Sequence, residues 1–176
     1  MSLLIYISNP TDKDPIIEKY GDKYYIQTLE EVILSTKTSE WGWSYGERLF
    51  DYEGIDQIAW IIERLRKKPE AKSATITCLN PEVDIRRNKG KHIPCLTLLD
   101  FKIRGRNLLL TSVFRSQDIG KKFYGDALAL FKLGEKVRKE LNCEKVEIFF
   151  FIVSAHIYEE DFEKIEKILK DVENEL

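Results

Sequence analysis

A cysteine, an arginine and an aspartate stand where apolar segments of the chain begin or end, and each could take part in chemistry. Cys95 follows Pro94 in the run IPCLTLLDF, Arg115 follows the run LLLTSVF, and Asp126 opens an amphipathic run. A thiolate is a strong nucleophile of modest basicity, and a planar guanidinium can hold an oxyanion with two hydrogen bonds. Strand ends and helix starts are where backbone geometry gathers such groups around a pocket.

Four further polar residues extend this set, again at the ends of apolar segments. Ser116 and Asp118 follow the same strand as the arginine, and His156 and Tyr158 follow the last apolar run. Singly, each type of group also has a purely structural explanation. A strand cysteine packs in a core, a carboxylate stabilises a helix start, an arginine pairs with a nearby acid, and a strand-end histidine is simply hydrogen-bonded. The set together is more informative than its members.

Hydrophobic periodicity predicts the elements that position these residues. Apolar and alternating runs predict strands over 3–8, 23–27, 74–79, 93–103, 107–114 and 146–154. The RGRN turn joins two of them into a hairpin, and the run 146–154, apolar on both faces, is expected in the centre of a sheet. Periodic runs predict helices over 55–65, 123–141 and 159–173, a helical turn at 29–35 and a polar loop at 80–90. The last helix is expected to be buried through Phe162, Ile165, Leu169 and Val172. A hairpin between helices and other strands favours an α+β fold.

Composition limits the classes of function. The chain of 176 residues is expected to form one domain over 1–176, and its 43% hydrophobic and 33% charged residues are ordinary for a soluble protein. A formal charge of -2 gives no reason to expect nucleic acid or an anionic membrane surface as a partner. The three cysteines, with two histidines, form neither a disulfide framework nor a zinc spacing. We therefore expect free thiols in a reducing cytoplasm, no metal and no membrane span.

The order of these motifs resembles that of the thymidylate synthase and deoxycytidylate hydroxymethylase family. The similarity runs through SYGERL (44–49), PEAKSATITCLNP (69–81), IPCLTLLDF (93–101), RSQD (115–118) and SAHIY (154–158). It implies a thymidylate synthase fold, in which a large mixed sheet is flanked by helices and forms a homodimer through its face. The chain is expected to be a short form of the family that lacks the C-terminal extension.

The resemblance also implies a reaction. A nucleophile that adds to carbon 6 of a pyrimidine makes carbon 5 reactive toward a one-carbon unit. The unit would come from a co-substrate, methylene-tetrahydrofolate or a related reduced pterin, and would be delivered to a pyrimidine deoxynucleoside monophosphate as a methyl or hydroxymethyl group. The implied roles are Cys95 as nucleophile, Tyr45 in proton transfer, Arg115, Ser116 and Lys72 at the phosphate, His156 and Tyr158 at the sugar hydroxyl, and Asp118 at the pterin.

Asp126 lies eleven positions after Arg115, where the family reads the base. Thymidylate synthases have asparagine there, whose amide donates to the 4-oxo group of uracil and accepts from ring nitrogen 3. An ionised aspartate only accepts, which suits the 4-amino group of cytosine, so the sequence favours dCMP. Three alternatives stay open: an ordinary thymidylate synthase that converts dUMP to dTMP, a non-catalytic nucleotide-binding relative, and a structural protein.

Three features of the sequence depart from the family pattern. The paired arginines that reach the phosphate across the dimer appear here as Lys72 and Ser73, so one cation remains as an ammonium group. Phe114 stands where the family usually has glutamine. The segment KKFYG (121–125) replaces Gly-x-Pro, and its two lysines are expected to form a solvated loop.

The catalytic glutamate of the family has no clear counterpart in this sequence. Glu30, Glu31 and Glu40 are all candidates by position. Trp41 and Trp43 could line a pterin pocket, although amphipathic aromatics also serve in cores without such a role.

Overall fold

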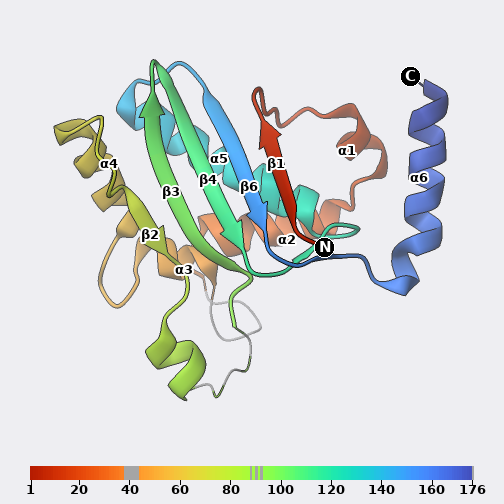
Figure 1. The fold of residues 1–176 in the computed structure, drawn as a ribbon, viewed down its shortest axis with the longest axis horizontal. Helices are drawn as coiled ribbons and strands as arrows, with labels where there is room; N and C mark the ends of the chain where they lie inside the picture. The colour runs from red at the N-terminus through yellow and green to blue at the C-terminus, as the bar shows by residue number, and fades with distance from the viewer. Residues whose placement is uncertain (38–43, 88, 90, 92, 176) are drawn as a thin grey trace.

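The computed structural model describes residues 1–37, 44–87, 89, 91 and 93–175. Its centre is a mixed sheet whose five strands lie in the order β1-β6-β4-β3-β2. In Figure 1 the helices α2 (Lys23–Leu34) and α5 (Phe123–Leu141) lie behind this sheet, and the face toward the viewer carries no helix of the described chain. The strands of this sheet are β1 (Leu3–Ile7), β2 (Thr75–Thr77), β3 (Leu96–Arg104), β4 (Asn107–Phe114) and β6 (Val146–Ile152).

The predicted hairpin and the predicted central strand are both confirmed. β3 and β4 pair antiparallel, and β6 lies between β4 and β1, parallel to the first and antiparallel to the second. The parallel pair needs a crossover, and α5 (Phe123–Leu141) supplies it. Leu130, Leu133 and Val137 of α5 are fully buried in one core with Leu110 and Phe150 of the sheet. The α+β class with a mixed sheet and flanking helices is therefore confirmed.

One predicted strand is wrong. Residues 23–27 open α2 (Lys23–Leu34) rather than a strand, although KYYIQ is rich in residues that favour strands. Asp22 caps the helix, because its carboxylate accepts hydrogen bonds from the N–H groups of Tyr24 and Tyr25. Val32 and Ile33 face the core, and α2 packs along α5. Tertiary packing of an amphipathic helix therefore outweighs the local strand propensity.

Of the remaining helices, those over 57–67 and 162–175 follow the predicted periodicity, whereas the short helices over 15–20 and 45–50 were not predicted. Two further differences concern a loop and the last helix. The region expected as a polar loop contains a π-helical turn over Pro81–Arg87. The last helix exists, but its apolar side is not buried as expected, since Phe162 is 49% and Leu169 57% exposed. These helices are α1 (Pro15–Tyr20), α3 (Tyr45–Phe50), α4 (Gln57–Lys67) and α6 (Phe162–Glu175), which a 3-10 turn (Glu159–Asp161) precedes. None of the helices in the described ranges could cross a membrane.

A second, two-stranded sheet lies next to the carboxyl ends of β4 and β6. β5 (Gln117–Asp118) pairs in parallel with β7 (Ala155–His156), and Gln117 stands opposite Ala155. The N–H of Ile119 donates to the carbonyl of His156 at 2.9 Å. This pairing brings two distant segments with predicted site residues side by side.

Candidate active site

Cys95 and Arg115 are in contact. Nη2 of Arg115 lies 3.7 Å from Sγ of Cys95, and it also donates to the carbonyl of Ile93 at 2.6 Å. Nε of Arg115 donates to the carbonyl of Pro94 at 2.9 Å, and the backbone N–H of Arg115 donates to the carbonyl of Cys95. The guanidinium is therefore bound to the chain segment that carries the thiol, and the two groups form one unit.

Tyr45, at the start of α3, fixes the same segment from the other side. Its hydroxyl oxygen accepts hydrogen bonds from the backbone N–H groups of Cys95 at 2.9 Å and of Leu96 at 3.1 Å. Burial raises the pKa of Tyr45, and the nearby charges of Cys95 and Asp126 raise it further. The phenol therefore stays protonated at neutral pH and holds the peptide that begins β3.

The electrostatics of the thiol are set by burial and by three charges. Burial raises the pKa of Cys95 above its ordinary value, Arg115 opposes the rise, Asp126 adds to it and Lys122 opposes it. In the protein without a ligand the net effect is a raised pKa of Cys95. Formation of the thiolate therefore depends on the positive charges of Arg115 and Lys122. Lys122 is exposed in a turn, as expected of a solvated loop, and its charge also lowers the pKa of Cys95. A lysine directly before a helix start is electrostatically unfavourable, and this signal could have indicated its role.

Asp126 is buried in the first turn of α5, and its side chain is 5% exposed. Its Oδ2 accepts a hydrogen bond of 2.7 Å from Nε2 of Gln117, which is itself buried. Burial raises the pKa of Asp126 to about 6, while the hydrogen bond from Gln117 and the charge of Lys122 lower it and Asp118 raises it. The structure thus places a titratable carboxyl within electrostatic reach of Cys95.

This carboxyl carries a stability cost that should depend on pH. The pKa of Asp126 is about 6 in the folded protein and about 3.9 in the unfolded chain. Ionisation of this carboxyl therefore lowers the free energy of unfolding. The loss begins at about pH 4 and is complete above pH 6. Asp126→Asn should therefore raise the free energy of unfolding by about 2–3 kcal/mol at pH 7.5 and leave it nearly unchanged at pH 4. Urea unfolding of both proteins at the two pH values measures this difference, and an equal gain at both would contradict it.

His156 and Ser116 face each other across the β5–β7 pair. Oγ of Ser116 lies 3.5 Å from Nδ1 of His156, and the His156 ring stands edge-on to Tyr158 with 5.1 Å between ring centres. The Tyr158 side chain is 55% exposed. The Ser116 hydroxyl, the imidazole and the tyrosine ring thus lie close together, directly after Arg115 in the chain, and could bind a hydroxylated ligand.

Comparison with known proteins identifies the arrangement. The fold matches the crystal structure of thymidylate synthase from T4 phage with a TM-score of 0.73 and 18% identity, covering 95% of this chain and 70% of the other. The family profile described as Thymidylate synthase matches residues 13–176. The chain belongs to the thymidylate synthase family. It is an enzyme of the one-carbon transferase class.

Archaeal relatives agree with this assignment. A protein of Methanosarcina mazei, provisionally named a thymidylate synthase, is 33% identical over 174 residues, which are 98% of this chain and 79% of its own. A protein of Methanocaldococcus jannaschii with the same provisional name is 34% identical over 173 residues, covering 93% and 77%. The predicted family is thus confirmed by sequence as well as by fold.

Asp118 provides an observation about the pterin that thymidylate synthases use. Its Oδ1 accepts hydrogen bonds from the N–H groups of Gly120 at 3.1 Å and Lys121 at 3.2 Å. Its Oδ2 is buried and has no hydrogen-bond partner within the described residues. A buried carboxylate oxygen needs a donor, and the ring N–H and amino groups of a pterin are donors. The residues present therefore fit the group.

Lys72 does not join the other predicted site residues within one chain. It is exposed in the turn between α4 and β2, and the next strand residue, Thr75, pairs with Asp100 of β3. Asp100 lies five residues along β3 from Cys95, which corresponds to about 16 Å. Ser73 is engaged elsewhere, since its hydroxyl accepts a hydrogen bond from Nε of Arg64 at 3.1 Å. Any phosphate contact by Lys72 therefore requires a second copy of the chain.

The catalytic glutamate of the family is still not identified. Glu30 forms an ion pair of 2.5 Å with Lys132, and Glu31 is exposed. The other candidates, Glu40 and the pterin-lining candidates Trp41 and Trp43, lie outside the described residues. Phe114, which replaces the family's glutamine, is buried in the core.

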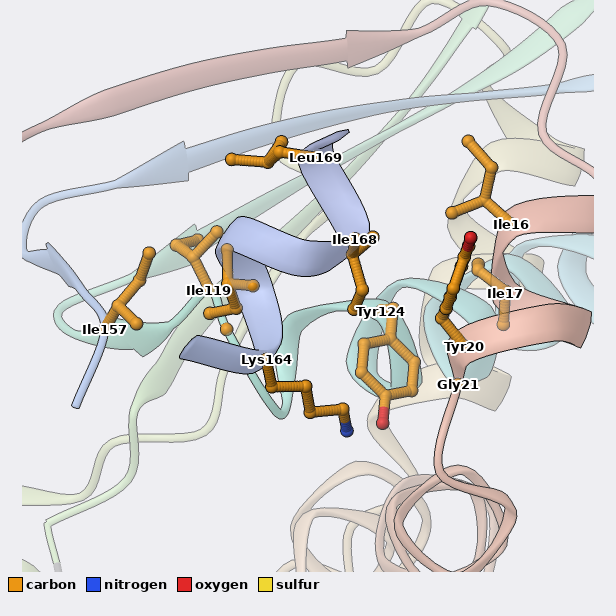
Figure 2. Close-up of a pocket in the computed structure, with 12 residues that line it drawn as sticks. Ile16, Ile17, Tyr20, Gly21, Ile119, Tyr124, Ile157, Lys164, Ile168 and Leu169 are labelled. Atoms are coloured by element: carbon orange, nitrogen blue, oxygen red, sulfur yellow. The ribbon is translucent and has the colours of Figure 1, made fainter. Parts of the chain in front are cut away.

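A cavity lies beyond Asp118, lined in part by Ile119 and Gly120. It has a volume of about 210 Å³ and opens between α1, α6 and the start of α5. Figure 2 shows Tyr124 next to this space, with residues of α1 and α6 around it. The lining is apolar apart from Lys164 and the two tyrosine hydroxyls. Within the described ranges, no group of three or more His, Cys, Asp or Glu could hold a metal ion.

Proposed function

We propose that residues 1–176 act as a single thymidylate-synthase-like domain that transfers a one-carbon unit to carbon 5 of a pyrimidine deoxynucleoside monophosphate, with a preference for dCMP. The observation that carries the proposal is the buried Asp126, whose charge acts on a thiol that contacts Arg115. The thiol supplies a nucleophile, the guanidinium an anion site, and the carboxylate a reader of the base.

In the proposed reaction the thiolate of Cys95 forms a bond to carbon 6. The electron pair of the 5,6 double bond moves to the bond between carbons 4 and 5, and the pair of the double bond between carbon 4 and nitrogen 3 moves to ring nitrogen 3, which takes up a proton. Asp126 accepts from the 4-amino group and stabilises a proton on ring nitrogen 3, so carbon 5 becomes nucleophilic. Arg115 and Ser116 hold the phosphate, and His156 with Tyr158 holds the sugar 3′-hydroxyl. Carbon 5 then loses its proton, and elimination of the thiolate from carbon 6 restores the 5,6 double bond.

The pterin would be held through Asp118, whose Oδ2 lacks a donor within the described residues. Methylene-tetrahydrofolate or a related reduced pterin supplies a one-carbon unit at the oxidation level of formaldehyde, which no side chain carries. The protein's own part is to orient this co-substrate against carbon 5 and to exclude water from the reacting atoms.

A second candidate is an ordinary thymidylate synthase that takes dUMP. It is supported by the provisional names of the archaeal relatives. With dUMP, an ionised Asp126 would set one acceptor against the 4-oxo acceptor, a mismatch worth roughly 1–3 kcal/mol. A protonated Asp126 would remove that mismatch, and its raised pKa makes this form accessible below about pH 6.

A thermal-shift panel with dCMP, dUMP, CMP and UMP at pH 7.5 tests the proposal. We expect dCMP to raise Tm most, because the ionised carboxylate matches only the 4-amino group. A larger shift with dUMP would favour the ordinary thymidylate synthase. Binding of dCMP without release of tritium from carbon 5 would indicate a non-catalytic relative, and the absence of any shift would contradict the nucleotide site.

Asp126→Asn should reverse the base preference. The asparagine amide can donate to a 4-oxo group and accept from ring nitrogen 3, so dUMP should gain and dCMP should lose affinity. The ratio of the two Kd values should change about 5- to 150-fold. Titration calorimetry with both nucleotides measures this ratio. An unchanged ratio would show that Asp126 does not read the base.

We also propose that the chain forms a homodimer through the uncovered face of the sheet. Leu4 and Phe151 are paired across β1 and β6 and are 67% and 39% exposed, and Tyr6 on the same face is 54% exposed. Burial of such an apolar face is favourable, and a second copy could bring its Lys72 to the phosphate. Sedimentation equilibrium measures the mass, and a monomer at micromolar concentration would contradict the dimer.

A further inference from the structure

Gln117 and Asp126 form a buried polar pair. Gln117 is 4% and Asp126 5% exposed, and Nε2 of the glutamine lies 2.7 Å from Oδ2 of the aspartate. The backbone of Gln117 is fixed independently, because it pairs with Ala155 in β7 and its N–H donates to the carbonyl of Ser154 at 2.9 Å. The amide is therefore anchored from the sheet and aimed at the carboxylate.

This pairing distinguishes the two carboxylate oxygens. A glutamine amide carries both a donor and an acceptor, and an ionised carboxylate accepts only, so the donor end must face it. Oδ2 of Asp126 accepts the hydrogen bond from Gln117. Oδ1 accepts no hydrogen bond from the other described residues. Oδ1 is thus the oxygen that remains for a ligand.

We propose that Gln117 is a specificity-determining positioning residue, which holds Oδ2 of Asp126 so that Oδ1 alone accepts from the 4-amino group of the base. This inference rests on the proposed function and assigns to Gln117 the orientation of the Asp126 carboxylate that reads the base. Gln117 acts through Asp126 and does not touch the base itself.

The same hydrogen bond should keep the buried carboxyl ionised at neutral pH. Burial raises the pKa of Asp126, Gln117 and Lys122 lower it, and Asp118 from β5 raises it. The other titratable groups that face it are Cys95 before β3 and Tyr45 of α3. On α2, which packs against α5, Glu30 forms an ion pair with Lys132 of α5.

Protonation of Asp126 changes what it can recognise. The ionised form accepts from the amino group of dCMP, and the protonated form can donate to the oxo group of dUMP. The ratio of Kd for dUMP to Kd for dCMP should therefore rise as pH increases through about 6. Loss of the Gln117 donor raises the pKa of Asp126. The increase in the Kd ratio should therefore occur at higher pH. Ionisation of the phosphate is common to both nucleotides and cancels in the ratio.

The test is titration calorimetry of both nucleotides between pH 5.5 and 8.5 with the full chain. In Gln117→Met, which keeps the length but loses the donor, the Kd ratio at pH 7 should fall on the order of tenfold, and the midpoint of its pH profile should rise. Gln117→Glu keeps the size of the side chain and places a second carboxyl beside Asp126. The two would share a proton to higher pH, so the midpoint should rise here too.

Two controls separate the possible failures. Gln27→Met removes another glutamine that lies near a carboxylate, in this case Glu31 on the surface of α2. This variant should leave the Kd ratio and the midpoint of its pH profile unchanged. Asp126→Asn should give a ratio that does not depend on pH. If wild type prefers dCMP and both Gln117 variants keep its ratio and midpoint, the role of Gln117 is wrong while the proposed function stands. If wild type itself shows no preference at any pH, the proposed function fails, and this inference fails with it.

Discussion

Cys95→Ala is expected to abolish release of tritium from carbon 5 of the labelled nucleotide. The thiol is the only nucleophile in contact with Arg115 among the described residues, at 3.7 Å, and without it carbon 6 cannot be attacked. Loss of a covalent nucleophile costs roughly 10⁴-fold or more in rate. Nucleotide binding should survive, because Arg115 keeps its contacts to the carbonyls of Ile93 and Pro94.

Cys143→Ala is the matched control for this variant. Cys143 is also a free, nearly buried thiol, but it lies after α5 and its carbonyl accepts from Arg138. We expect Cys143→Ala to keep tritium release within a few-fold of wild type, since it removes one small core group. Tritium release by Cys95→Ala at the wild-type rate would show that another group attacks carbon 6.

The second large effect is expected at the buried ion pair between Arg48 and Asp84. Arg48 of α3 donates two hydrogen bonds, of 2.6 and 2.7 Å, to the carboxylate of Asp84, and it also donates to the carbonyl of Cys78. The N–H of Asn80 donates to Asp84 at 2.8 Å. These bonds tie the π-helical turn after β2 to α3, ahead of the segment that carries Cys95.

Asp84→Asn should destabilise the protein by about 3–5 kcal/mol, because it removes the carboxylate charge that pairs with a buried guanidinium. For a chain of this size the loss corresponds to a fall in Tm of roughly 10 °C. Burial alone would raise the pKa of Asp84, but Arg48 and the N–H of Asn80 hold it below its usual value. The contribution of the pair is therefore present at neutral pH and is lost as pH falls through that folded pKa.

Glu140→Gln serves as the comparison. Glu140 pairs with Arg66 on the surface, where both side chains are more than half exposed, so its loss should cost less than 1 kcal/mol. Calorimetric unfolding at pH 7 measures all three proteins. An Asp84→Asn protein that melts within 2 °C of wild type would contradict the proposed importance of the pair.

Local periodicity was sufficient to predict several elements of the fold. The helix over 123–141, the β3–β4 hairpin and the central strand β6 appear as predicted, because their repeats of 3.6 or 2 residues and their turn lie within one segment. The same reasoning failed for KYYIQ, where local strand propensity and the observed helix disagree. That conflict was decided by the packing of α2 on α5, which no local pattern contains.

The sequence by itself determined the family, the order of the motifs and the presence of an aspartate eleven positions after Arg115. Only the tertiary structure brought Sγ of Cys95 to Arg115, paired β5 with β7, buried Asp126 against Gln117 and drew Lys122 into the field of the thiol. The physical reason is that residue type and spacing are local properties, whereas burial, charge proximity and parallel pairing depend on segments far apart in the chain. The pKa of Asp126 is set by those distant groups, and so, in the proposed function, is the choice of base.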